Sequence, residues 1–209
     1  MREYLLVFLV AAGTTYLLVG IAGKIAHLVG AVPPTRDRDV HREPVPRLGG
    51  LAMLGGLVAA FLVASVLPHM GRVFEESSAP RGVLIAATTI CLVGVADDIW
   101  NLSALMKFAG QLLAAGLLVV EGVQLFWLPL PSGNPFVLDS MQGAVLTVLL
   151  VVGTANAVNF IDGLDGLAAG VVGVGAAAFF SYAYILTVEQ GFTRLTMPAL
   201  VNPCSTVRM

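Results

Sequence analysis

The stretch NAVNFIDGLDGLAAG, residues 156–170, carries the side chains best suited to chemistry. It holds two amides and two carboxylates within ten residues, Asn156, Asn159, Asp162 and Asp165, and long apolar runs lie on both sides. A carboxylate near a bilayer core costs about 2.5–3.5 kcal/mol. These groups are therefore predicted to surround a polar ligand, such as a cation with an anionic group. The alternative is a polar turn, which explains Asp162 but not the two amides.

A second cluster lies in VADDIWNLSALMKF, where Asp97 and Asp98 precede Lys107. Adjacent carboxylates repel each other, and a nearby cation relieves the repulsion. Hard oxygen ligands suit Mg²⁺, which takes one or two carboxylates together with substrate phosphates. The alternative is a helix cap, in which an aspartate occupies the first turn of the following helix.

The third cluster is HREPVPRLGG, residues 41–50, whose prolines exclude a regular helix. His41, Arg42 and Arg47 are suited to phosphates, which arginine binds with two parallel hydrogen bonds. The alternative is that the positive charges only set the membrane orientation of the chain.

These clusters sit in a membrane protein. The 209 residues are 57% hydrophobic and 11% charged, whereas soluble domains contain about 25% charged residues. The net charge of −2 and the lack of a basic stripe exclude a nucleic-acid partner. A bilayer core of about 30 Å needs about 20 apolar residues in a helix. We expect an all-α polytopic bundle with six spans: 4–23, 48–67, 82–96, 104–120, 142–160 and 166–188.

The charges of the connections predict the orientation. Residues 24–47 hold five lysines and arginines, and residues 121–141 hold none. The positive-inside rule then places the first connection in the cytoplasm and the N-terminus outside. Counting spans places the third and fifth connections in the cytoplasm as well, so the three clusters are predicted to meet on one face.

The third span is shorter than the others. About 15 residues reach only about 22 Å, so we expect Asp97 and Asp98 to lie recessed below the membrane surface, unless the helix extends past Pro80. The expected site is a water-filled cleft in the cytoplasmic leaflet.

Together the three clusters resemble the motifs of the polyprenyl-phosphate N-acetylhexosamine-1-phosphate transferases. The patterns H-x-x-P-x-P-R-x-G-G, D-D-x-x-x-L-x-x-x-x-K-F and N-x-x-N-x-x-D-G-x-D-G-L-A of that family read here as residues 41–50, 97–108 and 156–168. The P-x-P-R form is more similar to the UDP-GlcNAc branch, which begins O-antigen, teichoic acid or arabinogalactan linkage units. The phospho-MurNAc-pentapeptide branch has a different form of this loop.

The resemblance implies transfer of GlcNAc-1-phosphate from a UDP-sugar to a polyprenyl phosphate, with Mg²⁺, or alternatively Mn²⁺, as cofactor. It also implies a multi-pass protein of the inner (plasma) membrane, and formation of a homodimer is left open. The implied catalytic residues are Asp97, Asp98, Asp162 and Lys107; the substrate-binding residues are Asn156, Asp165, His41 and Arg47; and the metal ligands are Asn159 and Asp98.

The family domain is longer than this chain, and a further aspartate motif in its second half holds the metal. We therefore expect residues 1–188 to form the N-terminal part of the transferase domain and residues 189–209 to form an atypical tail. Two alternatives to an active transferase remain: a truncated paralogue or scaffold fragment, and a transporter with an intramembrane polar relay.

Overall fold

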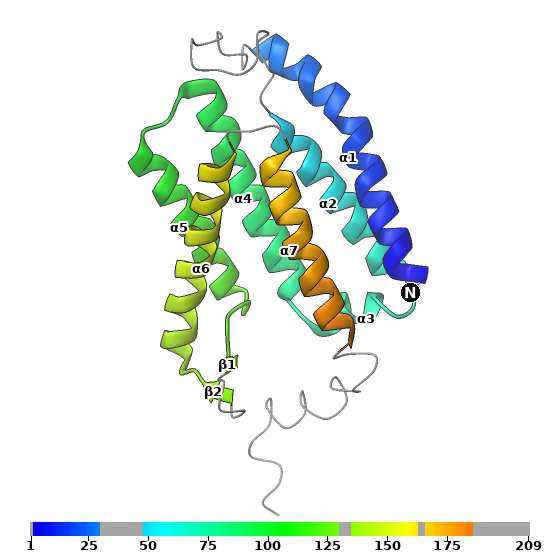
Figure 1. Cartoon of the computed structure of the whole chain (residues 1–209), viewed down its shortest axis with the longest axis vertical. Helices are drawn as coiled ribbons and strands as arrows, with labels where there is room; N and C mark the ends of the chain where they lie inside the picture. Colours follow the sequence, from blue (N-terminus) through cyan, green and yellow to red (C-terminus); the bar gives the residue numbers. More distant parts are fainter. Residues whose placement is uncertain (1, 30–47, 130–134, 163–165, 186–209) are drawn as a thin grey trace, which may run out of the picture. The chain divides into compact units, whose positions relative to one another are not determined.

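The computed structural model describes residues 2–29, 48–129, 135–162 and 166–185. The elements within these ranges are α1 (Arg2–Val29), α2 (Gly49–Val66), α3 (Gly71–Glu76), α4 (Ala79–Trp100), α5 (Ala104–Val120), β1 (Trp127–Pro129), β2 (Pro135–Val137), α6 (Ser140–Ile161) and α7 (Leu167–Tyr184) (Figure 1). The chain divides into two compact units, Met1–Gly153 and Thr154–Met209. Helix α6 begins in the first unit and ends in the second.

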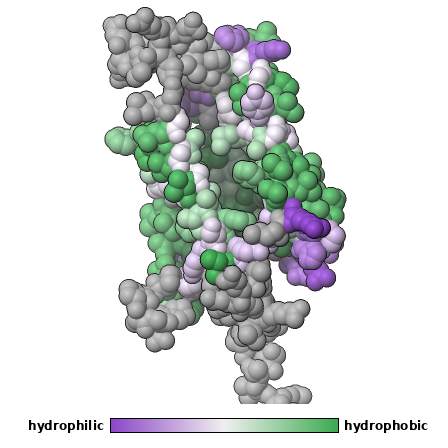
Figure 2. Space-filling model, turned by 45° about the vertical axis from the view of Figure 1, so that its right-hand side comes forward, coloured by the Kyte–Doolittle hydropathy of each residue, from purple (hydrophilic) through white to green (hydrophobic). Residues whose placement is uncertain are grey.

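The helices confirm an all-α polytopic membrane protein. Five of them, α1, α2, α4, α6 and α7, are long and apolar enough to cross a membrane, and α5 is a shorter apolar helix. Large apolar side chains lie exposed on these helices, including Phe8, Tyr16 and Leu62. Figure 2 shows apolar side chains along the flanks of the helices and hydrophilic ones toward their ends. Such flanks are suited to lipid, and each of the six predicted spans corresponds to one helix.

The length predicted for the third span is wrong. Helix α4 has 22 residues and is therefore about 33 Å long, enough to cross a bilayer core. Pro80 lies in its first turn, where a missing N–H group breaks no intrahelical hydrogen bond. Asp97 and Asp98 consequently lie inside the last turn of a full-length helix, and the argument that a short span recesses them does not hold.

The start of α5 excludes the helix-cap interpretation of the two aspartates. Ser103 is the N-cap residue, and its hydroxyl oxygen accepts a hydrogen bond from the Met106 N–H at 3.4 Å. Serine is among the preferred residues at this position. Asp97 and Asp98 therefore have no capping role in α5, whose bounds match the predicted span 104–120.

Helices α1 and α2 lie side by side (Figure 1) and approach closely. The buried residues of α2 are small and spaced four apart, at Ala52, Gly56, Ala60 and Ala64. A Cβ atom added at Gly56 would lie 2.8 Å from the carbonyl oxygen of Ala11 in α1. Small residues of this kind allow the backbones of membrane helices to pack against each other.

A short β-hairpin interrupts the connection between α5 and α6. Strands β1 and β2 are antiparallel, with Trp127 opposite Val137. The preceding segment is held on α6, because the Leu125 N–H donates to the Thr147 hydroxyl at 2.9 Å. The all-α class stands, with this hairpin added.

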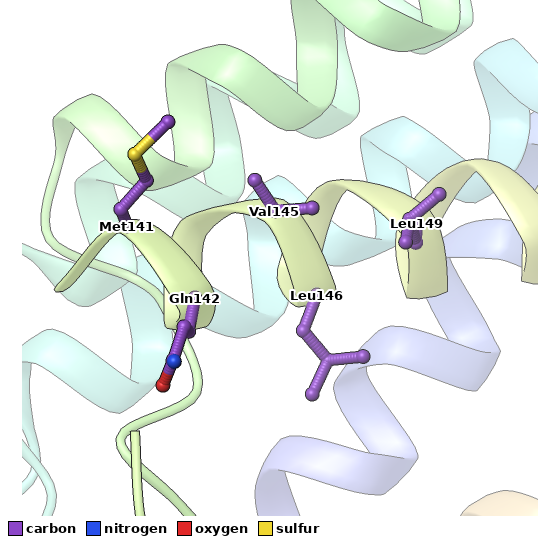
Figure 3. A pocket seen from close by; sticks show the side chains of 5 residues that line it. All are labelled: Met141, Gln142, Val145, Leu146 and Leu149. Carbon is purple, nitrogen blue, oxygen red and sulfur yellow. The ribbon is translucent and has the colours of Figure 1, made fainter. Parts of the chain in front are cut away.

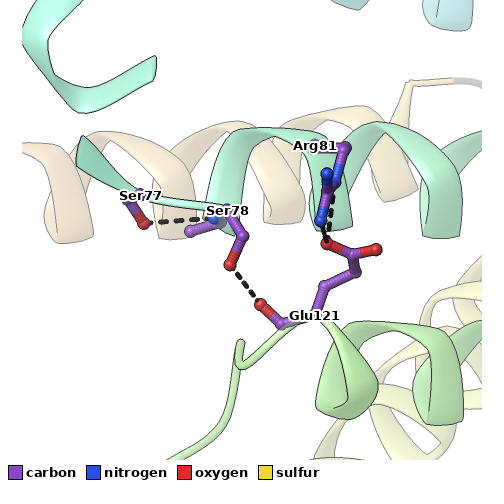
Figure 4. A network of polar contacts seen from close by, with 5 residues as sticks. Ser77, Ser78, Arg81 and Glu121 are labelled. Atoms are coloured by element: carbon purple, nitrogen blue, oxygen red, sulfur yellow. Dashed lines mark hydrogen bonds and ion pairs between the residues drawn. The ribbon is translucent and has the colours of Figure 1, made fainter. Parts of the chain in front are cut away.

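A polar network joins the start of α4 to the end of α5 (Figure 4). Arg81 donates to one carboxylate oxygen of Glu121, from Nε at 2.9 Å and from Nη2 at 2.6 Å. The Ser78 hydroxyl donates to the backbone carbonyl of Glu121 at 2.6 Å. The second and fourth connections therefore meet within the first unit.

Candidate functional site

The site begins where α4 ends and the chain reverses into α5. Asn101 adopts a left-handed conformation (φ 49°, ψ 66°), and its N–H donates to the Asp97 carbonyl at 2.8 Å. Asparagine tolerates this conformation better than most residues. Only residues 101–103 separate the two helices, so the first turn of α5 returns beside the last turn of α4.

This reversal brings Asp97 and Lys107 together. Lys107 Nζ lies 2.8 Å from Asp97 Oδ2, and the two side chains are 43% and 27% exposed. Because water reaches both groups, the ion pair stabilises the fold by only about 0.2–1 kcal/mol. An ammonium group has three N–H donors, so Lys107 can bind a second anion next to Asp97.

Asp98 contacts a different part of the chain. The Leu48 N–H donates to Asp98 Oδ2 at 3.3 Å, across 50 positions of sequence. Leu48 is the N-cap residue of α2 and has φ 73° and ψ 13°. The left-handed conformation costs a side-chain-bearing residue about 1–2 kcal/mol.

Two interactions hold Leu48 in this conformation. Its side chain is only 3% exposed, and burying a leucine contributes about 1.5–3 kcal/mol. Its hydrogen bond to a carboxylate contributes about 1.5–3 kcal/mol more. Together they exceed the cost of the backbone conformation. The residues packed in or against this small cluster are Ala26, Leu51, Val95 and Ile99.

The first and third connections therefore lie together, as predicted. Leu48 ends the first connection, and Asp98 lies in the last turn before the third. Within the first unit, the Leu48–Asp98 hydrogen bond thus connects the end of the first motif to the second motif. His41 and Arg47 lie outside the described residues.

The third motif belongs to the second unit. Asn156 and Asn159 occupy the last turns of α6, and Asp162 follows the helix, with its N–H donating to the Val158 carbonyl at 3.0 Å. All three polar residues are exposed, and the two amides share a helix face because they are three residues apart. Asp165 lies outside the described residues.

Sequence reasoning missed two residues of this site. Ser103 had a signal, because a serine directly before an apolar helical run is a typical N-cap. Leu48 had none, because the left-handed conformation normally indicates glycine or asparagine. Only the packing of the Leu48 side chain and the position of Asp98 explain it.

The donor atoms fit a hard metal ion in part. Asp97 and Asp98 supply carboxylate oxygens, and Mg²⁺ uses one or two carboxylates plus substrate phosphates and water. One oxygen of each is already engaged, by Lys107 and by the Leu48 amide. Among the described residues no group of three His, Cys, Asp or Glu side chains is arranged to hold a metal. A metal ion bound here would need further ligands from substrate, water or other residues.

A separate cavity of about 340 Å³ lies along one face of α6 (Figure 3). It is almost entirely apolar and contains none of the candidate residues. The residues that line it are Met141, Gln142, Val145, Leu146 and Leu149.

Comparison with known families gives the class of the chain. Residues 80–204 match the family described as Glycosyl transferase family 4, and the chain belongs to this family. The matched region includes the second and third motifs, and with them Asp97 and Lys107.

Individual relatives are informative as well. The chain is 43% identical to a decaprenyl-phosphate N-acetylglucosaminephosphotransferase of Mycobacterium leprae, over 97% of this chain and 52% of the relative. It is 34% identical to a probable undecaprenyl-phosphate N-acetylglucosaminyl 1-phosphate transferase of Bacillus subtilis, over 99% and 54%. A phospho-N-acetylmuramoyl-pentapeptide-transferase of Desulforudis audaxviator is 31% identical, over 94% and 66%.

The chain thus spans about half the length of the first two of these relatives. No solved structure matches it.

Proposed function

We propose that this chain acts in the transfer of GlcNAc-1-phosphate from UDP-GlcNAc to a polyprenyl phosphate. The observation that carries the proposal is the Asp97–Lys107 ion pair, which lies beside the Asp98–Leu48 hydrogen bond at the meeting of two connections. The arrangement combines a cation for a diphosphate with carboxylates suited to a metal. Relatives at 43% and 34% identity are named for this kind of transfer.

The proposed reaction exchanges one diphosphate for another. An oxygen of the polyprenyl phosphate attacks the β-phosphorus of UDP-GlcNAc, and the bond from that phosphorus to the bridging oxygen breaks. The products are polyprenyl-diphosphate-GlcNAc and UMP. A phosphate monoester has a second pKa of about 6 and is largely a dianion at pH 7, so the nucleophile needs little deprotonation. The protein must mainly position the substrates and neutralise charge.

The residues take roles that follow from their charges. Lys107 binds the diphosphate, and Asp97 and Asp98 position the lipid phosphate or support the cation. The first connection supplies His41 and Arg47 for phosphate oxygens. The proposed residues of the nucleotide pocket are Asn156, Asp162 and Asp165, and Asp162 is also a proposed catalytic residue.

A divalent cation, Mg²⁺ or Mn²⁺, would supply neutralisation of the diphosphate charge. Asp98 and Asn159 are its proposed ligands, because their side-chain oxygens are hard donors.

The direct test is transfer by the chain itself. The chain in lipid nanodiscs is incubated with radiolabelled UDP-GlcNAc, decaprenyl or undecaprenyl phosphate and Mg²⁺. We expect labelled lipid and an equal amount of UMP, and Lys107→Gln is the matched variant that should form little of either. If the wild-type chain forms no labelled lipid, the proposal fails for this chain.

We also propose that the site faces the cytoplasm and that the N-terminus lies outside. The charged first connection supports this orientation. A Val40→Cys variant, with both native cysteines changed to serine, should react with a membrane-impermeant maleimide only after the cells are permeabilised. Labelling in intact cells would invert the orientation.

A further inference from the structure

We propose that Asp98 is a positioning residue: it fixes the end of the first connection on the last turn of α4 through the Leu48 amide. Asp97 meanwhile orients Lys107, so the two adjacent aspartates hold two different segments. The contact between Asp98 and Leu48 is given by the geometry. Only its role in catalysis rests on the proposed function.

The start of α2 lacks the usual local cap. Helices commonly begin with a residue whose side chain accepts a hydrogen bond from the first free N–H groups, and Leu48 has no polar side chain. Asp98 instead reaches the Leu48 N–H from α4, at 3.3 Å. A carboxylate near a helix N-terminus also interacts favourably with the helix dipole. Asp98 therefore satisfies the N–H of the N-cap residue itself, as the carboxylate at N3 does in a capping box, but from another helix.

The backbone of Leu48 is fixed by its surroundings, so its position also determines where the preceding residue is attached. Its left-handed backbone, at φ 73°, is unusual for a leucine. Strained backbone of this kind persists only where the surroundings determine it. The buried Leu48 side chain forms a small cluster with Ala26, and Val95 and Ile99 of α4 pack against this cluster. The Leu48 amide is bound by Asp98, so α4 takes part in both interactions.

The position of Leu48 matters because of what precedes it. The amide nitrogen that Asp98 holds is joined directly to Arg47, and His41 lies six positions earlier. Both are proposed to bind phosphate oxygens. By fixing this amide, Asp98 sets where the phosphate-binding connection joins α2, next to the Asp97–Lys107 pair.

The Arg47–Leu48 peptide bond is a trypsin site, so limited proteolysis in nanodiscs tests the contact directly. Asp98→Ala removes the acceptor, and we expect the rate of cleavage at this bond to rise about tenfold or more, as for the loss of one charge-assisted hydrogen bond. Asp98→Asn keeps an acceptor oxygen but loses the charge, so its rate should lie between those of wild type and Asp98→Ala. Asp97→Ala is the matched control, because it removes the neighbouring charge and leaves the Leu48 contact intact.

Cleavage after Lys24, inside α1, reports general unfolding. If Asp98→Ala also accelerates that cleavage, Asp98→Ser is measured in its place, because its hydroxyl is too short to reach Leu48. The inference is overturned if neither variant cleaves faster at Arg47–Leu48 alone, if Asp98→Asn cleaves as fast as Asp98→Ala, or if Asp97→Ala accelerates cleavage equally. The proteolysis assay contains no substrate and does not depend on activity. Failure of this inference can therefore be distinguished from failure of the proposed function.

Discussion

The Asp97–Lys107 ion pair predicts two changes in substrate affinity with opposite signs. Lys107 must bind the diphosphate of UDP-GlcNAc while a carboxylate oxygen lies 2.8 Å from its ammonium group. Asp97 therefore competes with the substrate for the same charge. Replacing the lysine should weaken binding, and replacing the aspartate should strengthen it.

The structure sets the size of each effect. A hydrogen bond from an ammonium to a phosphate contributes about 1.5–3 kcal/mol. The ion pair is partly exposed, at 43% and 27%, and competes by about 0.2–1 kcal/mol. The net loss for Lys107→Gln is then about 0.5–2.8 kcal/mol, or about 2- to 100-fold in Kd. Asp97→Asn should gain about 0.2–1 kcal/mol, which is about 1.4- to 5-fold tighter binding.

The assay is equilibrium binding of labelled UDP-GlcNAc to the chain in nanodiscs, without divalent cation, at low ionic strength. Repeating it at high salt should reduce both differences, because salt screens partly exposed charges. Asp98→Asn is the matched control: it removes the adjacent charge but leaves the ion pair in place, so its affinity should lie closer to wild type than that of Asp97→Asn. Unchanged affinity in Lys107→Gln would refute the diphosphate role. Weaker binding in Asp97→Asn would refute the competition.

Two further predictions concern the packing that supports the site. Gly56→Ala should lower the free energy of unfolding by about 1–3 kcal/mol, as overpacking does, because the new Cβ would lie 2.8 Å from the Ala11 carbonyl oxygen. Gly13→Ala is the control, because the space around Gly13 is open. Equal thermal stability of the two variants would contradict the close packing of α1 and α2. Arg81→Gln should destabilise the chain by about 0.2–1 kcal/mol at low salt, since Arg81 is 70% exposed where it pairs with Glu121. In thermal melts in detergent, the difference in stability between the variant and the wild type should shrink at high salt. A difference in stability that persists at high salt would exclude an electrostatic origin.

The length of α4 shows where reasoning from the pattern failed. Pro80 marked the expected start of the third span, because proline interrupts helix interiors. In the first turn of a helix proline is tolerated, and α4 begins at Ala79. The apolar pattern of α5 had no such ambiguity, and its bounds were predicted without error. The bounds of α4 were predicted less well than those of α5 because the sequence does not show whether Pro80 lies inside the first turn of the helix or before it.

The sequence by itself determined the class of the protein, the places of the apolar helices among the described residues and the choice of candidate site residues. Those inferences depend on composition, apolar run length and the spacing of polar groups, which are properties of the chain before it folds. The counting of spans also predicted correctly that the first and third connections meet.

The tertiary structure alone decided the partners of the polar groups. Adjacent aspartates look equivalent in sequence, yet Asp97 pairs with Lys107 and Asp98 binds the Leu48 amide. The reason is geometric: successive residues of a helix point about 100° apart, since a turn contains 3.6 residues. The two carboxylates therefore face different neighbours, and only the packing of α2 and α5 against α4 determines which.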